Sequence, residues 1–463
     1  MTKIISQYKF HLLIFIFSFL ILTRFQIDPD LGWHLAIGNE FLQSGQILRA
    51  DPFSWTMPNY LWGNSYFLYQ IFVAFLFNNF GHIITFLIFG FLASLTVAVL
   101  TLHKKLNLEK SLVILLGAGI ATVNLGTRPH TISFLMFSIL LIFLERGFFK
   151  KYWHVLIWFL FFALWANLHR GFVLGALVLF GFLILKSLKK FKSKNLIWVL
   201  CIFASLLGTL ITPFPLSIWQ SGVIFDLASP VNLLNIAEWQ PVVVYFPVNL
   251  LFGLSGLIFI YIFLKNFKKV DPIWIIIAAL IFALPFLATN FVFYWVALFI
   301  FVTSRYFDFK IKLKRDLWAK IPIALSAFAT MIAIVLSFSE NLLKALDLKN
   351  LLVLNGYPVQ AASYLKRESL TSSVFNEYSW GGYLDWQAPE MKVFIDGRMA
   401  SWKKEDDTFI LADYLDIKRG KCDLLSTYDI KVLLVKKNDK FSCFGNWQVV
   451  YEDSLASVLV GPN

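Results

Sequence analysis

Charged residues are scarce in this sequence. Aspartate, glutamate, lysine and arginine make up 15% of its 463 residues, while 58% are hydrophobic; soluble domains carry about 25% charged residues. A chain of this composition lacks the polar side chains that a water-exposed surface requires. Several of its apolar runs approach the roughly 20 residues that cross a hydrocarbon core. The composition therefore excludes an ordinary soluble domain and predicts a chain embedded in a lipid bilayer.

Motifs for several common chemistries are also missing. The sequence contains no Walker loop, no G-x-G-x-x-G, no C-x-x-C and no H-x-x-x-H. Nucleotide hydrolysis is therefore disfavoured, and no metal-ligand spacing stands out. We expect no cofactor, although a divalent metal is left open. The net charge of +13 would suggest nucleic acid in a soluble protein, but the basic residues lie between apolar runs, so we expect no nucleic-acid partner.

Cysteine is rare as well, with three in the chain. Cys201 lies inside an apolar run, where we expect it to pack. Cys422 and Cys443 lie near the C-terminus and could pair if that part of the chain is exported. Their spacing alone does not show that they are adjacent.

About eleven apolar segments are predicted to cross the bilayer as helices. The first resembles a signal peptide, but no small-residue cleavage site follows it, so we interpret it as a retained helix. A further apolar stretch, 66–80, is short for a span and is expected to lie as a helix in the membrane interface. The predicted spans are 10–25, 83–102, 111–126, 131–145, 153–168, 172–186, 196–212, 248–264, 272–289, 291–305 and 319–338.

The distribution of lysine and arginine predicts the orientation. With the N-terminus in the cytoplasm, the inner loops hold basic clusters such as Lys104-Lys105. The outer segments before residue 339 hold only four basic residues, namely Arg24, Arg49, Arg128 and Arg170. We therefore expect a multi-pass protein of the plasma or inner membrane, with residues 339–463 on the extracytoplasmic side.

The pattern changes after residue 338. A helix is predicted near 358–368, and strands near 373–375, 393–395, 431–435 and 447–451. The expected fold is thus an all-α polytopic membrane domain over 1–338, followed by a small extracytoplasmic α/β domain over 339–463. The membrane domain would include a first outer loop, 26–65, and the interfacial helix 66–80.

The first outer loop begins with a pair of carboxylates. Pro29 separates Asp28 from Asp30, and Gly32 follows, so the backbone bends just past the end of the first helix. Two carboxylates in a partly desolvated place can differ in pKa, and one of them can serve as a base. The structural alternative is that they cap a short helix that begins near Trp33, as aspartate often does.

Other outer loops contribute further polar groups at helix ends. These are Arg128 and His130 around Pro129; Asn167, His169 and Arg170 in the next outer loop; and Glu238 beside Trp239. Ionisable groups near a membrane are costly and tend to have partners or functions. The alternatives are arginines that snorkel to lipid headgroups and histidines that satisfy helix ends. Because these groups fall on one membrane face, we expect a pocket with carboxylates and cations.

These motifs resemble a known family. The first-loop pattern comprises Asp28-Pro-Asp30-Leu-Gly-Trp33-His34, Asp51-Pro-Phe-Ser and Trp62-Gly-Asn; the other parts are Arg128-Pro-His130, Trp165-Ala-Asn-Leu-His169, Glu238-Trp239, Phe375-Asn-Glu-Tyr-Ser-Trp380-Gly-Gly-Tyr383 and Val393-Phe-Ile-Asp396-Gly-Arg398. The loop motifs resemble those of bacterial GT-C glycosyltransferases, in the branch of protein mannosyltransferases and lipid A aminoarabinose transferases, and the last two motifs resemble the exported tails of poorly characterised bacterial relatives. That branch commonly pairs Asp with Glu in the first loop, whereas this chain has two aspartates.

The resemblance implies a function. It implies inverting transfer of a sugar from a polyprenyl-phosphate donor to a lipid, glycan or protein acceptor on the outer face. Asp30, or else Asp28, would be the base. Arg128, His130, His169 and Arg170 would bind the donor phosphate, and the substrate-binding residues would be Trp33, His34, Asp51, Trp62, Asn167 and Glu238. The tryptophans could stack on a sugar ring, and interfacial anchoring is equally compatible with their position.

Two other classes of function remain open from the residues alone. A transporter or flippase of a lipid-linked or anionic substrate would need polar residues at mid-membrane depth and an inner gate, which the basic inner ends do not indicate. A non-catalytic assembly protein would use its exported tail to bind a partner, and the aspartates would then be dispensable.

Overall fold

A computed structural model describes residues 2–102, 104–189, 195–220, 235–308, 317–439, 443 and 445–462. The internal contacts divide the chain into two compact units. We call residues 1–25, 83–211 and 237–344 the helical unit, and residues 26–82, 212–236 and 345–463 the tail unit. Each is described by itself below.

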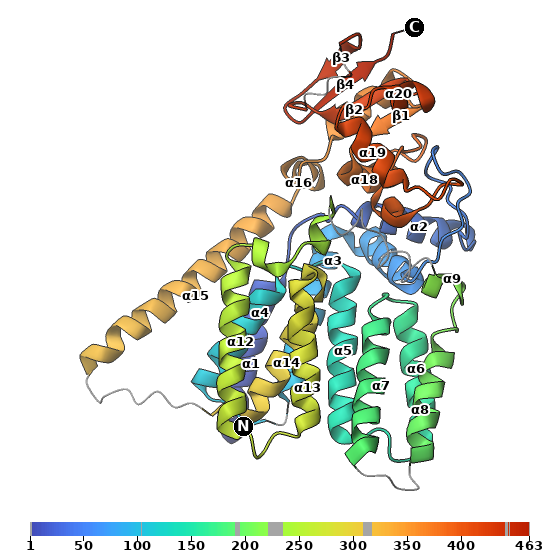
Figure 1. Cartoon of the computed structure of the whole chain (residues 1–463). Coiled ribbons are helices and arrows are strands. Elements are labelled where there is room, and N and C mark those ends of the chain that lie inside the picture. The colour runs from blue at the N-terminus through green and yellow to red at the C-terminus, as the bar shows by residue number, and fades with distance from the viewer. Residues whose placement is uncertain are drawn as a thin grey trace. The chain divides into compact units, whose positions relative to one another are not determined.

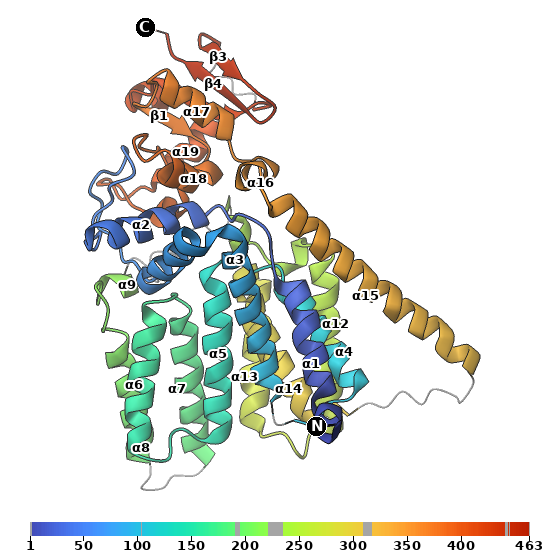
Figure 2. The same ribbon diagram turned by 180° about the vertical axis from the view of Figure 1, so that it is seen from behind.

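Long apolar helices build the helical unit, and in Figures 1 and 2 most of them run side by side. Each segment predicted to span the membrane coincides with a helix. They are α1 (Thr2–Leu22), the second part of α3 (Phe67–Thr101), α4 (Leu108–Ala121), α5 (Pro129–Arg146), α6 (Trp153–Ala166), α7 (Phe172–Lys189), α8 (Asn195–Gly208), α12 (Val248–Asn266), α13 (Pro272–Ala283), α14 (Val292–Tyr306) and α15 (Leu317–Ala345). Three short 3-10 helices, η2 (Ala237–Trp239), η3 (Val242–Val244) and η5 (Thr289–Phe291), lie between them, and η4 (Leu284–Phe286) continues α13.

Length and apolarity qualify only some of these helices as complete spans. Within the described residues, α3, α5 and α12 are long and apolar enough to cross a membrane, and 329–345 with 348–354 is a fourth candidate that is bent by 111°. Other apolar helices are shorter, at 10–17 residues, and would need their interfacial flanks to cross. The structure thus supports a membrane protein, while the number of about eleven spans stays a prediction.

Helix α3 is broken at Gly81. This residue has φ 77° and ψ 172°, a conformation that is essentially restricted to glycine. Residues before the break belong to the tail unit and residues from 83 onward to the helical unit. The break falls where the sequence predicted the end of the interfacial helix 66–80 and the start of the span 83–102.

The tail unit contains a sheet of four strands in its described part, in the order β1-β2-β4-β3. Strand β1 (Val374–Asn376) is parallel to β2 (Val432–Lys436), and β4 (Ala456–Val460) is antiparallel to both β2 and β3 (Gln448–Glu452). The helices of this unit are α2 (Leu31–Ser44), the first part of α3, α9 (Ser217–Trp219), α16 (Leu348–Leu354), α17 (Val359–Arg367), η6 (Tyr378–Trp380), α18 (Gly381–Gln387), η7 (Gly397–Ser401), α19 (Ile410–Lys418) and α20 (Asp423–Thr427).

The predicted helix near 358–368 and the strands near 373–375, 431–435 and 447–451 are confirmed. The strand predicted near 393–395 is wrong: Val393 forms an isolated bridge with Ser54 of the first outer loop. An apolar run was correctly identified there, but its backbone pairs with a distant loop and not with the sheet. Strand β4 was not foreseen.

The first outer loop shares a hydrophobic core with the C-terminal segment. Trp33, Ile37, Met57 and Trp62 pack in one buried cluster with tail residues such as Phe394. Backbone and side-chain hydrogen bonds join the same two segments, for example from Trp55 N to the Val393 carbonyl (3.1 Å). The observed division therefore differs from the expected boundary at residue 338, because the loop 26–65 belongs to the compact unit of the tail.

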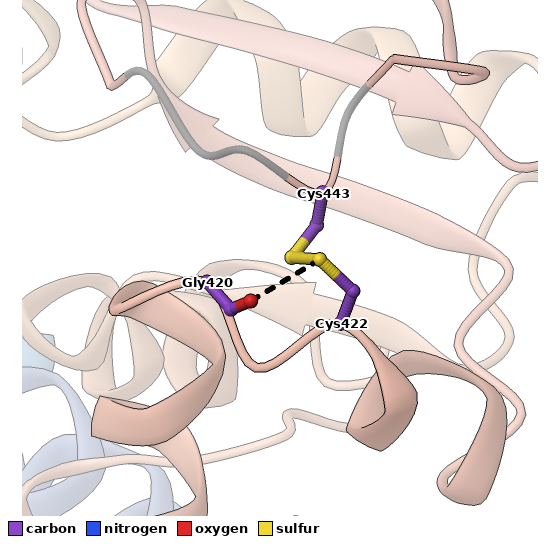
Figure 3. Close-up of a disulfide and its surroundings, with 3 residues drawn as sticks. All are labelled: Gly420, Cys422 and Cys443. Carbon is purple, nitrogen blue, oxygen red and sulfur yellow. Dashed lines mark hydrogen bonds between the residues drawn. A yellow bond between two sulfur atoms is a disulfide. The ribbon is translucent and has the colours of Figure 1, made fainter.

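Cys422 and Cys443 form a disulfide in the tail unit (Figure 3). Their Cα atoms are 5.2 Å apart, within the usual range for a disulfide. The bridge connects the start of α20 to the segment between β2 and β3. Cys201 is free and buried, as predicted.

Candidate functional site

The two aspartates at the start of the first outer loop have different local roles. Asp28 Oδ1 accepts a hydrogen bond from the backbone N–H of Asp30 (3.0 Å) and so closes a turn around Pro29. Asp30 is the N-cap residue of α2, yet its carboxylate makes no cap hydrogen bond. Its Oδ1 instead accepts from the indole Nε1–H of Trp33 (3.0 Å). Asp30 is half-buried, so its carboxylate is held by a side chain and keeps some access to solvent.

In the helical unit, Arg128 and Glu238 form an ion pair. Arg128 precedes Pro129 and is extended, with φ −128° and ψ 151°, as residues before proline prefer. Proline at the first helical position then starts α5 at once. The guanidinium thus lies at the N-terminal end of an 18-residue helix, where the helix dipole favours anions. Glu238 comes from η2, more than a hundred positions later in the chain.

Glu238 is ionised despite its surroundings. Burial raises the pKa of its carboxyl, but the positive charge of Arg128, with smaller contributions from His130 and Arg170, outweighs this effect and holds the pKa at about 2. Arg170 also lies over the ring of Trp239, with 6.0 Å between its guanidinium carbon and the ring centroid. Four of the predicted residues therefore converge within the helical unit.

The two predicted histidines are neighbours, with ring centroids 4.7 Å apart. Both are buried. His169 Nδ1 lies 2.6 Å from Ser133 Oγ and accepts from the Gly171 N–H (3.2 Å). Trp165 Nε1 donates to the same serine oxygen, which leaves the serine hydroxyl proton for His169. This arrangement favours the neutral tautomer with its proton on Nε2.

Asn167 has a structural role. Its side-chain amide donates to the carbonyls of Ala163 (2.8 Å) and Ile211 (2.7 Å). It thereby satisfies backbone groups at the ends of α6 and of α8, the neighbouring helix. Both amide hydrogens are used in these bonds, and the predicted contact of Asn167 with a substrate stays a prediction.

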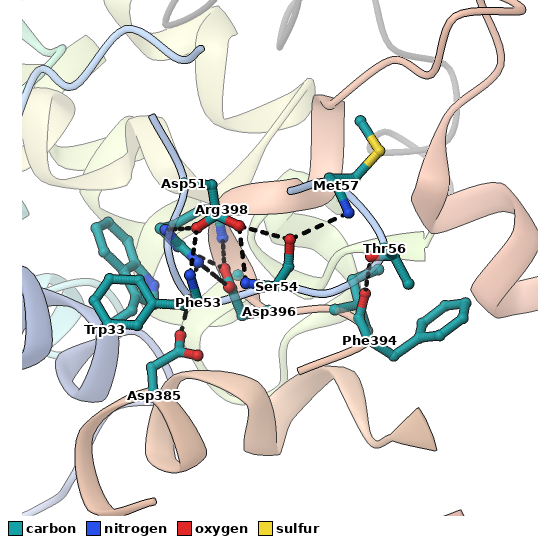
Figure 4. A network of polar contacts seen from close by, with 12 residues as sticks. Trp33, Asp51, Phe53, Ser54, Thr56, Met57, Asp385, Phe394, Asp396 and Arg398 are labelled. Atoms are coloured by element: carbon teal, nitrogen blue, oxygen red, sulfur yellow. Dashed lines mark hydrogen bonds and ion pairs between the residues drawn. The ribbon is translucent and has the colours of Figure 1, made fainter. Parts of the chain in front are cut away.

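A second cluster of charges is buried in the tail unit (Figure 4). The Arg398 guanidinium has no exposed surface and contacts Asp51 Oδ1 through Nη1 (2.8 Å) and Asp396 Oδ1 through Nε (3.0 Å). The backbone N–H and hydroxyl of Ser54 donate to the other oxygen of Asp51. Burial raises the pKa of Asp51, but Arg398 and Ser54 outweigh it, so its pKa lies below the usual range. Asp51 is therefore an ionised partner inside the tail unit, which differs from the predicted contact with a substrate.

Asp385 completes this cluster. Its Oδ2 lies 3.9 Å from Arg398 Nη2, too far for a hydrogen bond. Burial, and then the charge of Asp396, raise the pKa of Asp385 well above its ordinary value. One guanidinium thus faces three carboxyl groups, and Asp385 is the one whose pKa is raised.

The remaining aromatic candidates are core residues. Trp33 and Trp62 are buried and pack edge to face with centroids 6.1 Å apart. His34 is 2% exposed and packs against Tyr66 and Tyr69. All three rings are thus part of a packed core, and the predicted contacts of Trp33, His34 and Trp62 with a substrate stay predictions.

Other residues in these clusters were not predicted as site residues. Arg398, Asp396 and Gly397 were recognised only as part of a tail motif, although aspartate, glycine and arginine in sequence are an unusual group for an apolar segment. Asp385 and Asn290 carried no distinguishing signal. Asn290 contributes a hydrogen bond to Glu238. The two residues are brought together by the fold, and no sequence pattern indicates that they are close.

The apolar helices and the mixed α/β tail unit together give the chain a fold that is similar to that of solved archaeal oligosaccharyltransferases. The chain is similar to the archaeal oligosaccharyltransferase AglB from Archaeoglobus fulgidus, solved with an inhibitory peptide and a dolichol-phosphate: TM-score 0.54, 12% identity, covering 93% of this chain and 70% of that chain. The apo form of the oligosaccharyltransferase from the same organism gives a TM-score of 0.52 at 13% identity, covering 92% and 69%. Comparisons with protein-family models and with curated proteins give no match.

Proposed function

We propose that this chain is a membrane glycosyltransferase that moves a sugar from a polyprenyl-phosphate donor to an acceptor on the extracytoplasmic face. The observation that carries the proposal is the GT-C-type fold over almost the whole chain, shared with an enzyme solved with a dolichol-phosphate and a peptide. The cationic groups at the start of α5 provide the chemistry that a lipid phosphate requires.

In the proposed reaction, the acceptor hydroxyl oxygen attacks the anomeric carbon from the face opposite the phosphate. The bond between that carbon and the phosphate oxygen breaks, so the configuration inverts. Asp30 takes the hydroxyl proton, and the polyprenyl phosphate leaves with the electron pair. A positioned base of this kind contributes about 10² to 10⁴ in rate. We assign the base to Asp30 because the Asp28 carboxylate closes the turn of its own backbone, whereas the Asp30 carboxylate is oriented by the Trp33 side chain.

Arg128 and Arg170 would stabilise the charge that develops on the leaving phosphate. Glu238 holds the Arg128 guanidinium in place and balances part of the positive charge of the site. A donor phosphate would compete with Glu238 for that guanidinium. Preorganised donors aimed at a developing charge typically contribute about 10² to 10³ in kcat.

The test is transfer of radiolabelled sugars from a panel of polyprenyl-phosphate hexoses and pentoses to endogenous acceptors, in membranes that contain the full chain. We expect Asp30→Asn to lower kcat by about 10² to 10⁴. Asp28→Asn should lose less, since the amide oxygen can still accept from the Asp30 N–H. The matched control is Asp429→Asn, an exposed aspartate of the tail unit.

Full activity in both Asp28→Asn and Asp30→Asn would overturn the assignment of the base. For the phosphate site, Arg128→Ala should raise the KM for the lipid donor, and Arg49→Ala, which removes another basic residue of the outer segments, should not. An equal effect of the two arginine variants would overturn the role of Arg128. Movement of a lipid-linked sugar across liposome membranes without transfer would favour the flippase alternative.

A further inference from the structure

The segment Asp396-Gly397-Arg398 grips two distant points of the first outer loop. Arg398 holds Asp51 through a buried ion pair, and the next residue toward the N-terminus, Gly397, lies against Asp30. Asp396 fixes the segment, because its Oδ1 accepts from the Arg398 backbone N–H (2.7 Å). All these residues belong to the tail unit.

The contact at Gly397 depends on the missing side chain. A Cβ atom built at this position would lie 2.0 Å from Asp30 Oδ1 and 3.2 Å from Trp33 Nε1. Gly397 is not among the glycines with positive φ, so its backbone does not require glycine. The close approach of the Asp30 carboxylate is what requires glycine at this position. The carboxylate is thus seated between the indole N–H of Trp33 and the bare Cα of Gly397.

Arg398 gives this seat its rigidity. Its guanidinium is fully buried, bonded to Asp51 and Asp396, and within 5.1 Å of the Phe53 ring centroid. Such a bidentate, packed arginine has one allowed position. Asp30 at the start of the loop and Asp51 near its middle are therefore held against two consecutive residues of the C-terminal segment, Gly397 and Arg398.

We infer that Gly397 and Arg398 are positioning residues for the Asp30 carboxylate. Gly397 provides the space that this carboxylate occupies, which we call its seat, and Arg398 acts as a lock that fixes the segment that contains Gly397. This inference rests on the proposed function only for its catalytic consequence. The C-terminal segment would then set the position of the proposed base.

The first experiment measures the seat without any enzymatic assay. Carboxyl groups of the full chain in nanodiscs are labelled with a carbodiimide and glycine ethyl ester, and the rate at each site is read by mass spectrometry. In Gly397→Ala we expect the Asp30 carboxylate to be displaced and to label at least about 3-fold faster, with exposed Asp429 unchanged. Gly445→Ala is the matched control, because a Cβ there meets no atom within 4 Å. An unchanged Asp30 rate in Gly397→Ala overturns the seat.

The second experiment measures transfer in the same variants. We expect Gly397→Ala to lower kcat by 10- to 100-fold with little change in donor KM, and the acid limb of the pH profile to move to higher pH, because loss of the Trp33 N–H bond disfavours the ionised carboxylate. Trp33→Phe should move the limb in the same direction. A fall in kcat together with a comparable rise in the donor KM, and with no shift of the pH profile, overturns the positioning role of Gly397.

Failure of the two proposals can be told apart. If the wild-type chain transfers no sugar while Gly397→Ala still exposes Asp30, the proposed function fails and the seat stands. If Gly397→Ala does not fold, Arg398→Lys addresses the same lock, since it keeps the charge but loses the fork. We expect it to raise the labelling rates of Asp51 and Asp30, and unchanged rates overturn the lock.

Discussion

At the scale of single residues, the buried cluster around Arg398 is a problem of charge balance. One guanidinium cannot neutralise three carboxylates, and uncompensated charge is costly where water is excluded. Among the described residues, neither oxygen of Asp385 receives a hydrogen bond. A neutral acid solves both difficulties, because its own O–H can donate to Asp396. The position of Asp385 therefore favours the protonated form of its carboxyl group.

This state predicts how Asp385→Asn changes stability. The pKa of Asp385 is raised in the folded chain, whereas an aspartate of the unfolded chain has a pKa near 3.9. Between these two pKa values the unfolded carboxyl is ionised and the folded one is protonated, so folding takes up a proton. The free energy of unfolding of the wild-type tail unit should fall as pH rises from about 4 to the folded pKa, by up to about 1.4 kcal/mol per pH unit. The amide has no proton to take up and can still donate to Asp396. Asp385→Asn should then be more stable than wild type at pH 7 and similar at pH 4.

The measurement is hydrogen exchange of peptides from 381–400 in the full chain at several pH values, comparing variant and wild type at each one. Asp429→Asn serves as a control, because its carboxylate is exposed and lies outside the buried cluster. A gap between Asp385→Asn and wild type that stays constant across pH would contradict the protonated state.

At the scale of elements, hydropathy predicted helices well because each apolar run must satisfy its own backbone in lipid. Runs such as 131–145 and 153–168 correspond to α5 and α6 within two or three residues. The short strands of the tail were harder. Val393 satisfies its backbone with Phe53 and Trp55 of the first outer loop, and no local pattern announces a partner more than 300 residues away.

The disulfide is the element-scale feature with the clearest energetic consequence. It closes a loop of 21 positions between α20 and the segment before β3, and a loop of this length restricts the unfolded chain by about 3 kcal/mol. We expect Cys422→Ser with Cys443→Ser to destabilise the tail unit by about 2–4 kcal/mol. Thermal unfolding followed by tryptophan fluorescence, with and without a thiol reductant, measures this effect.

The control follows from the free cysteine. Reductant should lower the unfolding midpoint of wild type and of Cys201→Ala equally, and should have no effect on the double serine variant. A reductant effect that persists without Cys422 and Cys443 would show that the bridge is not its source.

At the scale of the whole molecule, three separate chain segments meet in the tail unit: 26–82, 212–236 and 345–463. If a compact unit lies wholly on one side of a membrane, the chain crosses the membrane an even number of times between the segments that build that unit. The predicted spans number six between the first and second segments and four between the second and third. Both numbers are even, so the predicted topology would place the three segments on the same side of the membrane, and this topology stays a prediction.

The candidate site was predictable to a similar degree. Arg128, His130, Arg170 and Glu238 converge as the sequence suggested, because costly polar groups at helix ends need partners. Gly397 was not foreseen as a contact of Asp30. Its role depends on the absence of atoms at one point of a folded structure, which residue type and spacing cannot reveal.

The shared packing predicts that the first outer loop cannot keep its structure without the C-terminal segment 345–463. Removal of 345–463 would expose Trp33, Ile37, Met57 and Trp62, and each buried side chain of this size contributes about 1.5–3 kcal/mol. It would also leave Asp51 without Arg398. We expect limited proteolysis of fragment 1–344 in nanodiscs to cut 26–65 at least about 10-fold faster than in the full chain, with α5 to α8 still protected.

A chain cleaved at an engineered protease site between α15 and α16 is the matched control, because the noncovalent core persists there and the loop should stay protected. Equal protection of 26–65 in the fragment and in the cleaved chain would show that the loop folds independently, and the dependence of Asp30 on the tail would then have no structural basis.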